Sequence, residues 1–178
     1  MMRRSTRVTL IAGAVFLTKM AGSFVLATPA KPLKLANPLA IELVSLGKLT
    51  VKTGKTVFMP GTAAGTRLVI DFAEVAIDGP RLQAKKAAVA GGDWLTIGPD
   101  NVATLDIRIL VETQDGASIL IHGLGRTDSA KFTSGAPCYF TPLFETSDSR
   151  YAWLNKIQAV AKGQSQGDTV VFELYEVR

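Results

Sequence analysis

Hydrophobic and polar residues alternate one by one along much of the chain. The cleanest stretch is 104–112, in which leucine, isoleucine and valine occupy every second position and charged residues occupy most of the positions between them. A period of two residues is that of a β-strand with one buried face. Because Asp115-Gly116 supplies the positive φ angles of a tight hairpin turn, we expect 118–124 to return as the antiparallel partner strand.

The same kind of pattern predicts strands over most of the chain from residue 41 onward, with turn residues between them. The expected strands are 41–51 with a bulge at Gly47, 56–59, 66–77, 81–90, 138–146 and 169–177. Residues 151–161 are predicted as either a short helix or a bent strand. Many short strands without a sustained helical period indicate an all-β sandwich or barrel. We favour a single antiparallel β-barrel, because closure removes the exposed sheet edges that invite aggregation.

The first 30 residues have the pattern of a secretory signal peptide. A positively charged start is followed by an apolar run over 8–17 and by small residues at 27–30. This predicts a secreted or periplasmic protein. Lys19 interrupts the apolar run, so an uncleaved membrane anchor is the alternative. Two prolines in 31–38 indicate an extended linker, which leaves 39–178 as the β-barrel domain.

Composition and charge narrow the possible functions. The formal net charge is +5, but four of the 20 basic residues and none of the 15 acidic residues lie in the first 30 positions. The remaining domain is almost neutral, which argues against a nucleic-acid partner. A single cysteine, Cys138, excludes an internal disulfide, and a single histidine, His122, excludes a multi-histidine site. We therefore predict neither a metal nor a cofactor, and expect both residues to be satisfied within the fold.

Five short motifs carry a resemblance to a known family. In chain order they are Gly61-Thr-Ala-Ala-Gly65-Thr-Arg67, Gly91-Gly-Asp93-Trp94, Asp115-Gly116-Ala117, Phe144-Glu145-Thr and Arg150-Tyr151-Ala-Trp153-Leu-Asn155. Their order and spacing over 39–177 resemble the UPF0311-like family catalogued as domain of unknown function 3237 (DUF3237). The resemblance implies a calycin-like antiparallel β-barrel without an assigned activity. The chain departs from the family at 72–78, where members usually carry more glycine.

Polar and aromatic residues are densest in 142–155, a stretch typical of either a pocket rim or a tightly pinned corner. The candidate ligand-binding residues are Arg67, Trp94, Tyr151, Trp153 and Asn155. Arginine can hold an anionic or carbonyl group with its planar fork, and tryptophan can form a stacking wall. Four of them have a structural alternative: Arg67 as a surface arginine, Trp94 as a core tryptophan, Tyr151 as a plug of the barrel end, and Asn155 as a corner pin.

Three residues are candidates for acid–base chemistry. Asp93 stands beside Trp94, and an apolar neighbour makes a carboxylate more basic, as a general base requires. Glu145 either faces a ligand or pairs with Arg150, and Tyr151 can donate a hydrogen bond to a developing oxyanion. The structural alternative for Asp93 is a turn aspartate that caps the backbone.

Two functions of different kinds follow from these candidates. The first is an exported barrel that binds a small, largely apolar ligand. The second is a cofactor-free isomerase, cyclase or lyase that moves a proton with a carboxylate in the barrel. A structural envelope protein with a filled barrel is a third possibility. The sequence leaves the oligomeric state open, a homodimer included.

Overall fold

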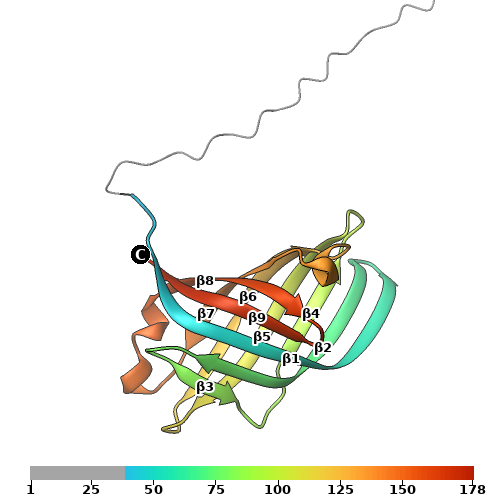
Figure 1. Cartoon of the computed structure of the whole chain (residues 1–178). Coiled ribbons are helices and arrows are strands. Elements are labelled where there is room, and N and C mark those ends of the chain that lie inside the picture. Colours follow the sequence, from blue (N-terminus) through green and yellow to red (C-terminus); the bar gives the residue numbers. More distant parts are fainter. Residues whose placement is uncertain (1–38) are drawn as a thin grey trace, which may run out of the picture. The chain divides into compact units, whose positions relative to one another are not determined.

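The computed structural model describes residues 39–178, which contain nine β-strands and three single-turn 3-10 helices (Figure 1). The strands are β1 (Leu43–Thr62), β2 (Gly65–Asp78), β3 (Gln83–Lys86), β4 (Gly92–Ile97), β5 (Val102–Thr113), β6 (Ser118–Asp128), β7 (Cys138–Glu145), β8 (Gln158–Gln166) and β9 (Thr169–Val177). The 3-10 helices are η1 (Phe132–Ser134), η2 (Ser149–Tyr151) and η3 (Leu154–Lys156). The leader and linker predicted for residues 1–38 lie outside the described residues. None of the helical turns in 39–178 has the length and apolar character needed to cross a membrane.

The nine strands form one sheet in which every pairing is antiparallel. This confirms the all-β class and the single antiparallel sheet. β2 and β5 are bridged by β4 at one end and by β3 at the other, and the pairings continue from β5 through β6, β7, β8 and β9 to β1. β7 and β8 pair over only three positions, from Cys138↔Gly163 to Phe140↔Ala161. The sheet is thus strongly curved and barrel-like, without being clearly closed along this seam (Figure 1).

Several elements differ from their predicted bounds. β1 runs as one strand of 20 residues through the break expected between 51 and 56, where its register to β2 shifts instead. The strand expected over 81–90 is reduced to the four residues of β3. Residues 151–161 combine both predicted alternatives, since the helical turns end at Lys156 and β8 begins at Gln158. The bulge predicted at Gly47 is confirmed by a register shift between β1 and β9.

β4 is an additional strand that begins with glycine. A Cβ atom at Gly92 would lie 2.3 Å from the carbonyl oxygen of Ile70 on β2. Only a residue without a side chain permits this approach of the two strands. The glycine therefore lets β4 pair with β2 from Thr66↔Ile97 to Asp71↔Gly92, which places Asp93 directly opposite Ile70.

The concave side of the sheet holds the hydrophobic core. Alternate residues of β5 and β6 point into it, as the sequence pattern predicts, and the rings of Phe140 and Phe172 lie 6.2 Å apart at a tilt of 59°. Leu154 of η3 is fully buried in the same cluster. Since η3 belongs to the connection between β7 and β8, its leucine fills the interior beside the seam where those strands separate. The interior beside this seam is therefore filled by packed side chains and is not a hollow.

Candidate functional site

A small cavity remains inside the sheet, at the end where β2 is bridged by β4. Its volume is about 90 Å³. Apolar side chains from several elements form most of the wall, including those of Val51, Ile70, Leu95, Leu105, Phe132 and Phe172. Ile70, Leu95 and Phe132 are only half-buried, so the cavity lies next to solvent at this end of the sheet.

The carboxyl group of Asp93 faces this cavity from β4. The residue is 5% exposed, and its Oδ1 accepts a hydrogen bond from the backbone N–H of Asp106 at 2.9 Å. Within residues 39–178 it forms no ion pair with a basic side chain. Burial raises the pKa of Asp93 to about 6, against the opposing effect of the Asp106 hydrogen bond. Such a group can both accept and donate a proton near neutral pH.

Cys138 lies in the same wall. It is a buried free cysteine, as the sequence indicated. Burial is the main cause that raises the pKa of its thiol to about 11, with a smaller contribution from the negative charge of Asp93. The thiol is therefore neutral at physiological pH and acts as a small apolar part of the cavity wall.

This burial predicts a slow reaction of Cys138 with thiol reagents. At a pH of about 8, modification by a water-soluble aromatic disulfide should be at least about 100-fold slower in the folded protein than in the denatured chain, because less thiolate is present and access is blocked. The absorbance of the released thiol measures both rates. Rapid, complete modification of the folded protein would show that the cavity is open to large reagents.

Arg67 and Trp94 lie on the opposite, outer side of the sheet. Arg67 is paired with Thr96, and Trp94 with Val69, whereas the alternate residues of β2 and β4 line the cavity. The guanidinium of Arg67 donates a hydrogen bond to the carbonyl oxygen of Trp94 at 3.1 Å. The Trp94 ring in turn lies 5.8 Å from the guanidinium carbon of Arg108. Neither residue lines the cavity, so the candidate role of Arg67 as an arginine that holds a ligand inside the barrel is corrected.

Tyr151 and its neighbours form an anchor at the other end of the sheet. The Tyr151 hydroxyl donates to Asp115 Oδ1 at 3.1 Å, and Arg150 binds Asp115 at 2.8 Å and Asp148 at 2.6 Å. The side-chain hydrogen bonds from Arg150 are the main cause that lowers the pKa of Asp148 to about 2. These contacts fix η2 against the β5–β6 turn. They fit the corner-pin alternative for this stretch.

The remaining candidates of the stretch have structural partners as well. The Asn155 side chain accepts from the N–H of Thr146 and donates to its carbonyl oxygen, both at 2.9 Å. The guanidinium carbon of Arg81 lies 3.9 Å from the centre of the Trp153 ring. Glu145 Oε1 lies 2.9 Å from the His122 ring, so that histidine is satisfied within the fold as expected.

The sequence candidates therefore do not converge on one site. Arg67 is level with Thr96 and Thr104, near the start of β5. Tyr151 binds Asp115, which follows the opposite end of that strand. The nine-residue interval from Thr104 to the end of β5 corresponds to about 30 Å of extended strand. Of the candidates, only Asp93 lines the interior cavity.

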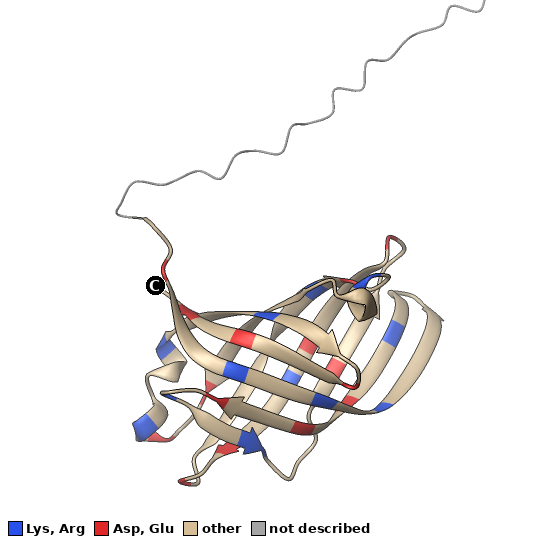
Figure 2. Cartoon of the chain, viewed as in Figure 1, with Lys and Arg blue, Asp and Glu red and all other residues tan. Residues whose placement is uncertain are grey.

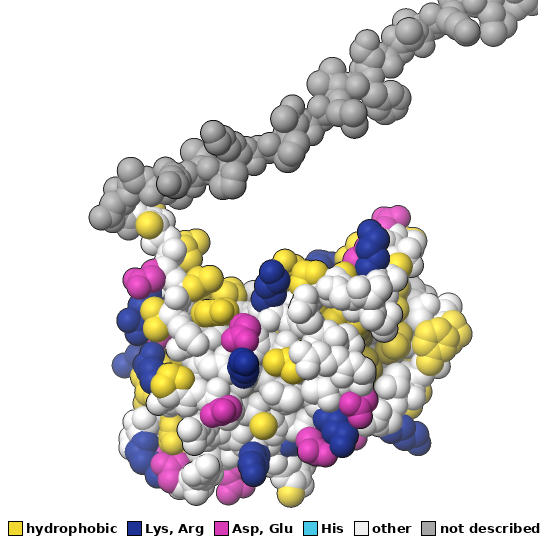
Figure 3. Space-filling model, viewed as in Figure 1, with side chains coloured by type: hydrophobic (Ala, Val, Ile, Leu, Met, Phe, Trp, Pro, Cys, Tyr) yellow, Lys and Arg dark blue, Asp and Glu magenta, His cyan; other side chains and the backbone are white. Residues whose placement is uncertain are grey.

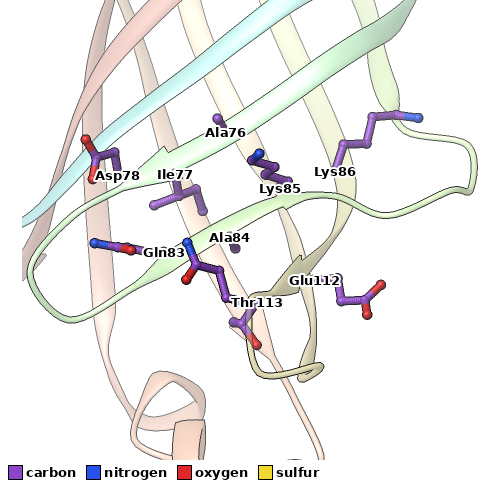
Figure 4. A pocket seen from close by; sticks show the side chains of 10 residues that line it. Ala76, Ile77, Asp78, Gln83, Ala84, Lys85, Lys86, Glu112 and Thr113 are labelled. Atoms are coloured by element: carbon purple, nitrogen blue, oxygen red, sulfur yellow. The ribbon is translucent and has the colours of Figure 1, made fainter.

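Larger depressions lie on the outer surface but lack comparable chemistry. The one in Figure 4 has a volume of about 450 Å³ and lies over β2, β3 and β5. Its charged side chains, such as those of Lys85 and Glu112, are exposed, and Lys86 donates a hydrogen bond to the Val89 carbonyl oxygen at 2.8 Å. Elsewhere on the strands, acidic and basic residues are interspersed (Figure 2). The buried carboxyl group makes the smaller interior cavity the stronger candidate.

Comparisons with known proteins agree with this fold. The family model described as "Protein of unknown function (DUF3237)" matches residues 41–177. A UPF0311 protein of Bradyrhizobium diazoefficiens is 27% identical over 141 residues, which are 72% of this chain and 91% of that protein. A structure described as a beta-barrel like protein, from Acinetobacter baumannii, superimposes with a TM-score of 0.71 at 26% identity, covering 81% of this chain and all of the other.

One relative carries a name that states a reaction. The "Hydroalkoxylation enzyme phnH" of Penicillium herquei is 39% identical over 72 residues, which are 40% of this chain and 42% of that enzyme. The structure of an enzyme from Penicillium herquei superimposes with a TM-score of 0.61 at 22% identity, covering 80% of this chain and 98% of the other. The latter likeness concerns the fold alone.

Proposed function

Because the chain belongs to the DUF3237 family, whose function is unknown, we propose its activity from the cavity itself. It is a cofactor-free enzyme of the cyclase, isomerase or lyase type that acts on a small, largely apolar substrate. In this proposal the Asp93 carboxylate takes a proton from the substrate and later returns it. The family match confirms the resemblance drawn from the five motifs and adds no reaction of its own.

The single observation that carries this proposal is a carboxyl group held in an apolar cavity at an accessible end of the sheet. Apolar surroundings exclude the water that would otherwise stabilise the charge, and they raise the pKa of Asp93 to about 6. A group with such a pKa exchanges protons with a substrate more effectively near neutral pH than an ordinary aspartate does. For an aspartate that only caps a turn, burial in an apolar cavity would bring no benefit.

The addition of a hydroxyl group across a conjugated carbon–carbon double bond illustrates the chemistry. The Asp93 carboxylate takes the hydroxyl proton, and the oxygen forms a bond to one alkene carbon as the π bond breaks. The electron pair moves to the neighbouring carbon, which then takes the proton back from Asp93. No atom is lost and nothing is oxidised or reduced, so one carboxyl group suffices. The hydroalkoxylation enzyme among the relatives supports this class of reaction.

Binding without conversion is the second candidate. Its support is the same apolar lining, since a small-molecule site is typically concave and apolar with few polar groups.

The proposal also includes a calycin-like barrel, supported by the nearly complete circuit of strand pairings. It further includes export or membrane anchoring, supported by the residue pattern of 1–30.

Incubation with ortho-hydroxychalcone and ortho-allylphenol tests the proposal. Proton NMR should detect the ring-closed isomer of the conjugated probe forming faster than in protein-free controls, in which the same closure proceeds without a catalyst. With Asp93 as the base, the rate should rise with pH through about 6 and then level off, because the carboxylate form is required. Binding of the probes without conversion would favour the binding function instead. Neither binding nor conversion would contradict both.

A further inference from the structure

The inner face of the sheet continues beyond Asp93 as an apolar strip. Asp93 is paired with Ile70, and one step further out Leu95 is paired with Leu68. Phe58 of β1 is paired with Leu68 on the other side. Directly paired residues of an antiparallel sheet project to the same face, so all of these side chains share the face that lines the cavity. We define the strip as Phe58, Leu68 and Leu95.

The strip is not covered by other parts of the described chain. Phe58 is 62% exposed, and Leu68 and Leu95 are only partly buried. The reason lies in the strand lengths, since β9 begins at Thr169, opposite Lys52, and the outer part of β1 has no partner on that side. Figure 3 shows hydrophobic side chains exposed over this end of the β1–β2 hairpin. Apolar surface left open in continuity with a cavity is typical of a ligand-binding groove.

We propose that the strip binds the apolar tail of an amphipathic small molecule whose polar, reacting head lies at Asp93. This rests on the proposed function and specifies its substrate class. The charged group lies at the inner end and the apolar side chains lie toward solvent, so the head must enter first. The distance along β2 from Ile70 in the cavity wall to Leu68 in the strip is about 7 Å, which matches a chain of roughly five carbon atoms.

The size of the cavity supports the same occupant. Its volume of about 90 Å³ corresponds to roughly three water molecules. A substrate with more than a few heavy atoms must therefore extend along the strip. A protein partner would leave the Asp93 cavity unused, whereas a tailed small molecule accounts for both features.

Binding of para-alkylphenols from ethyl to hexyl, measured by isothermal titration calorimetry, tests this inference. The dissociation constant should fall about fourfold per added methylene group, the factor expected for burial of apolar surface. Phe58→Ser should weaken binding of hexylphenol at least about tenfold while changing ethylphenol little. Val57→Ser is the matched control, because Val57 is 47% exposed on the same strand but projects to the outer face. It should leave the whole series unchanged.

The possible results separate this inference from the proposed function. An affinity independent of chain length, or an equal loss in Phe58→Ser and Val57→Ser, would overturn the tail site. A chain-length dependence that persists in Asp93→Asn would support it. A wild-type protein that shows this dependence but converts no probe would keep the tail site and refute the acid–base activity.

Discussion

Replacement of Asp93 by asparagine is expected to lower turnover by a factor of about 100 to 10,000, the usual contribution of a general acid or base. Asparagine has nearly the same shape and keeps the oxygen that accepts the Asp106 N–H, but it cannot carry the proton. Affinity for the same probe should change little, since the apolar wall remains. The rates of probe conversion under saturating conditions measure the first effect, and calorimetry measures the second.

The same substitution should stabilise the fold in a pH-dependent way. The pKa of Asp93 is 3.8 in a model peptide and about 6 in the folded protein, so between these values the folded state holds a proton that the unfolded chain has lost. Wild-type stability therefore falls as pH rises through this interval, by about 3 kcal/mol in total, and is constant above it. Urea unfolding should give equal stabilities below pH about 4 and a more stable Asp93→Asn variant above pH about 6.

Glu112→Gln provides a control, because Glu112 is an exposed carboxylate on the outer face of β5. It should leave turnover unchanged. Wild-type turnover in Asp93→Asn would remove this carboxyl group from the chemistry. A stability difference that does not vary with pH would show that the carboxyl group is not held in its neutral form by burial.

Replacement of Leu154 by alanine should lower the free energy of unfolding by about 2–5 kcal/mol. The side chain is 0% exposed and packs into the core beside the seam where β7 and β8 separate. Because β7 and β8 pair over only three positions, truncation of this side chain leaves a cavity that can be filled only if the short η3 turn moves. Leu124→Ala, at a position 59% exposed on the outer face, should change stability by less than about 0.5 kcal/mol. Similar losses in both variants would contradict the role of Leu154 as a plug.

Strand pairing was accessible from the sequence wherever alternation was regular. The expected hairpin of 104–112 and 118–124 exists as β5 and β6, whose register runs from Val102↔Asp128 to Glu112↔Ser118. β4 escaped notice because Gly91 precedes it and Gly92 begins it. Glycine has a low strand propensity, and Gly92 is present for close backbone contact. Consequently the sequence proposed Asp93 as a candidate without placing it inside the sheet.

The site was harder to predict because alternation identifies two faces but not which one is buried. Arg67 alternates with Leu68 and Ile70 along β2, and the face that lines the cavity is the one that carries the leucine and isoleucine. The dense polar stretch 142–155 had two interpretations, a pocket rim and a pinned corner, which its composition did not separate. Its contacts fit the corner: the Asn155 side chain binds the backbone of Thr146, and the Tyr151 hydroxyl binds Asp115.

The free outer part of β1 also bears on how this protein avoids unwanted self-association. Beyond Lys52 one edge of the strand lacks β9, and its backbone amide and carbonyl groups could template the addition of a foreign strand. Lys55 and Pro60 flank the apolar residues Val57–Met59. A lysine side chain disfavours the addition of a strand to this edge because its charge would have to be buried. Proline disfavours it because proline has no N–H to donate. The unpaired outer part of β1 thus leaves the strip accessible to small molecules, while its edge remains a poor template for the growth of fibrils.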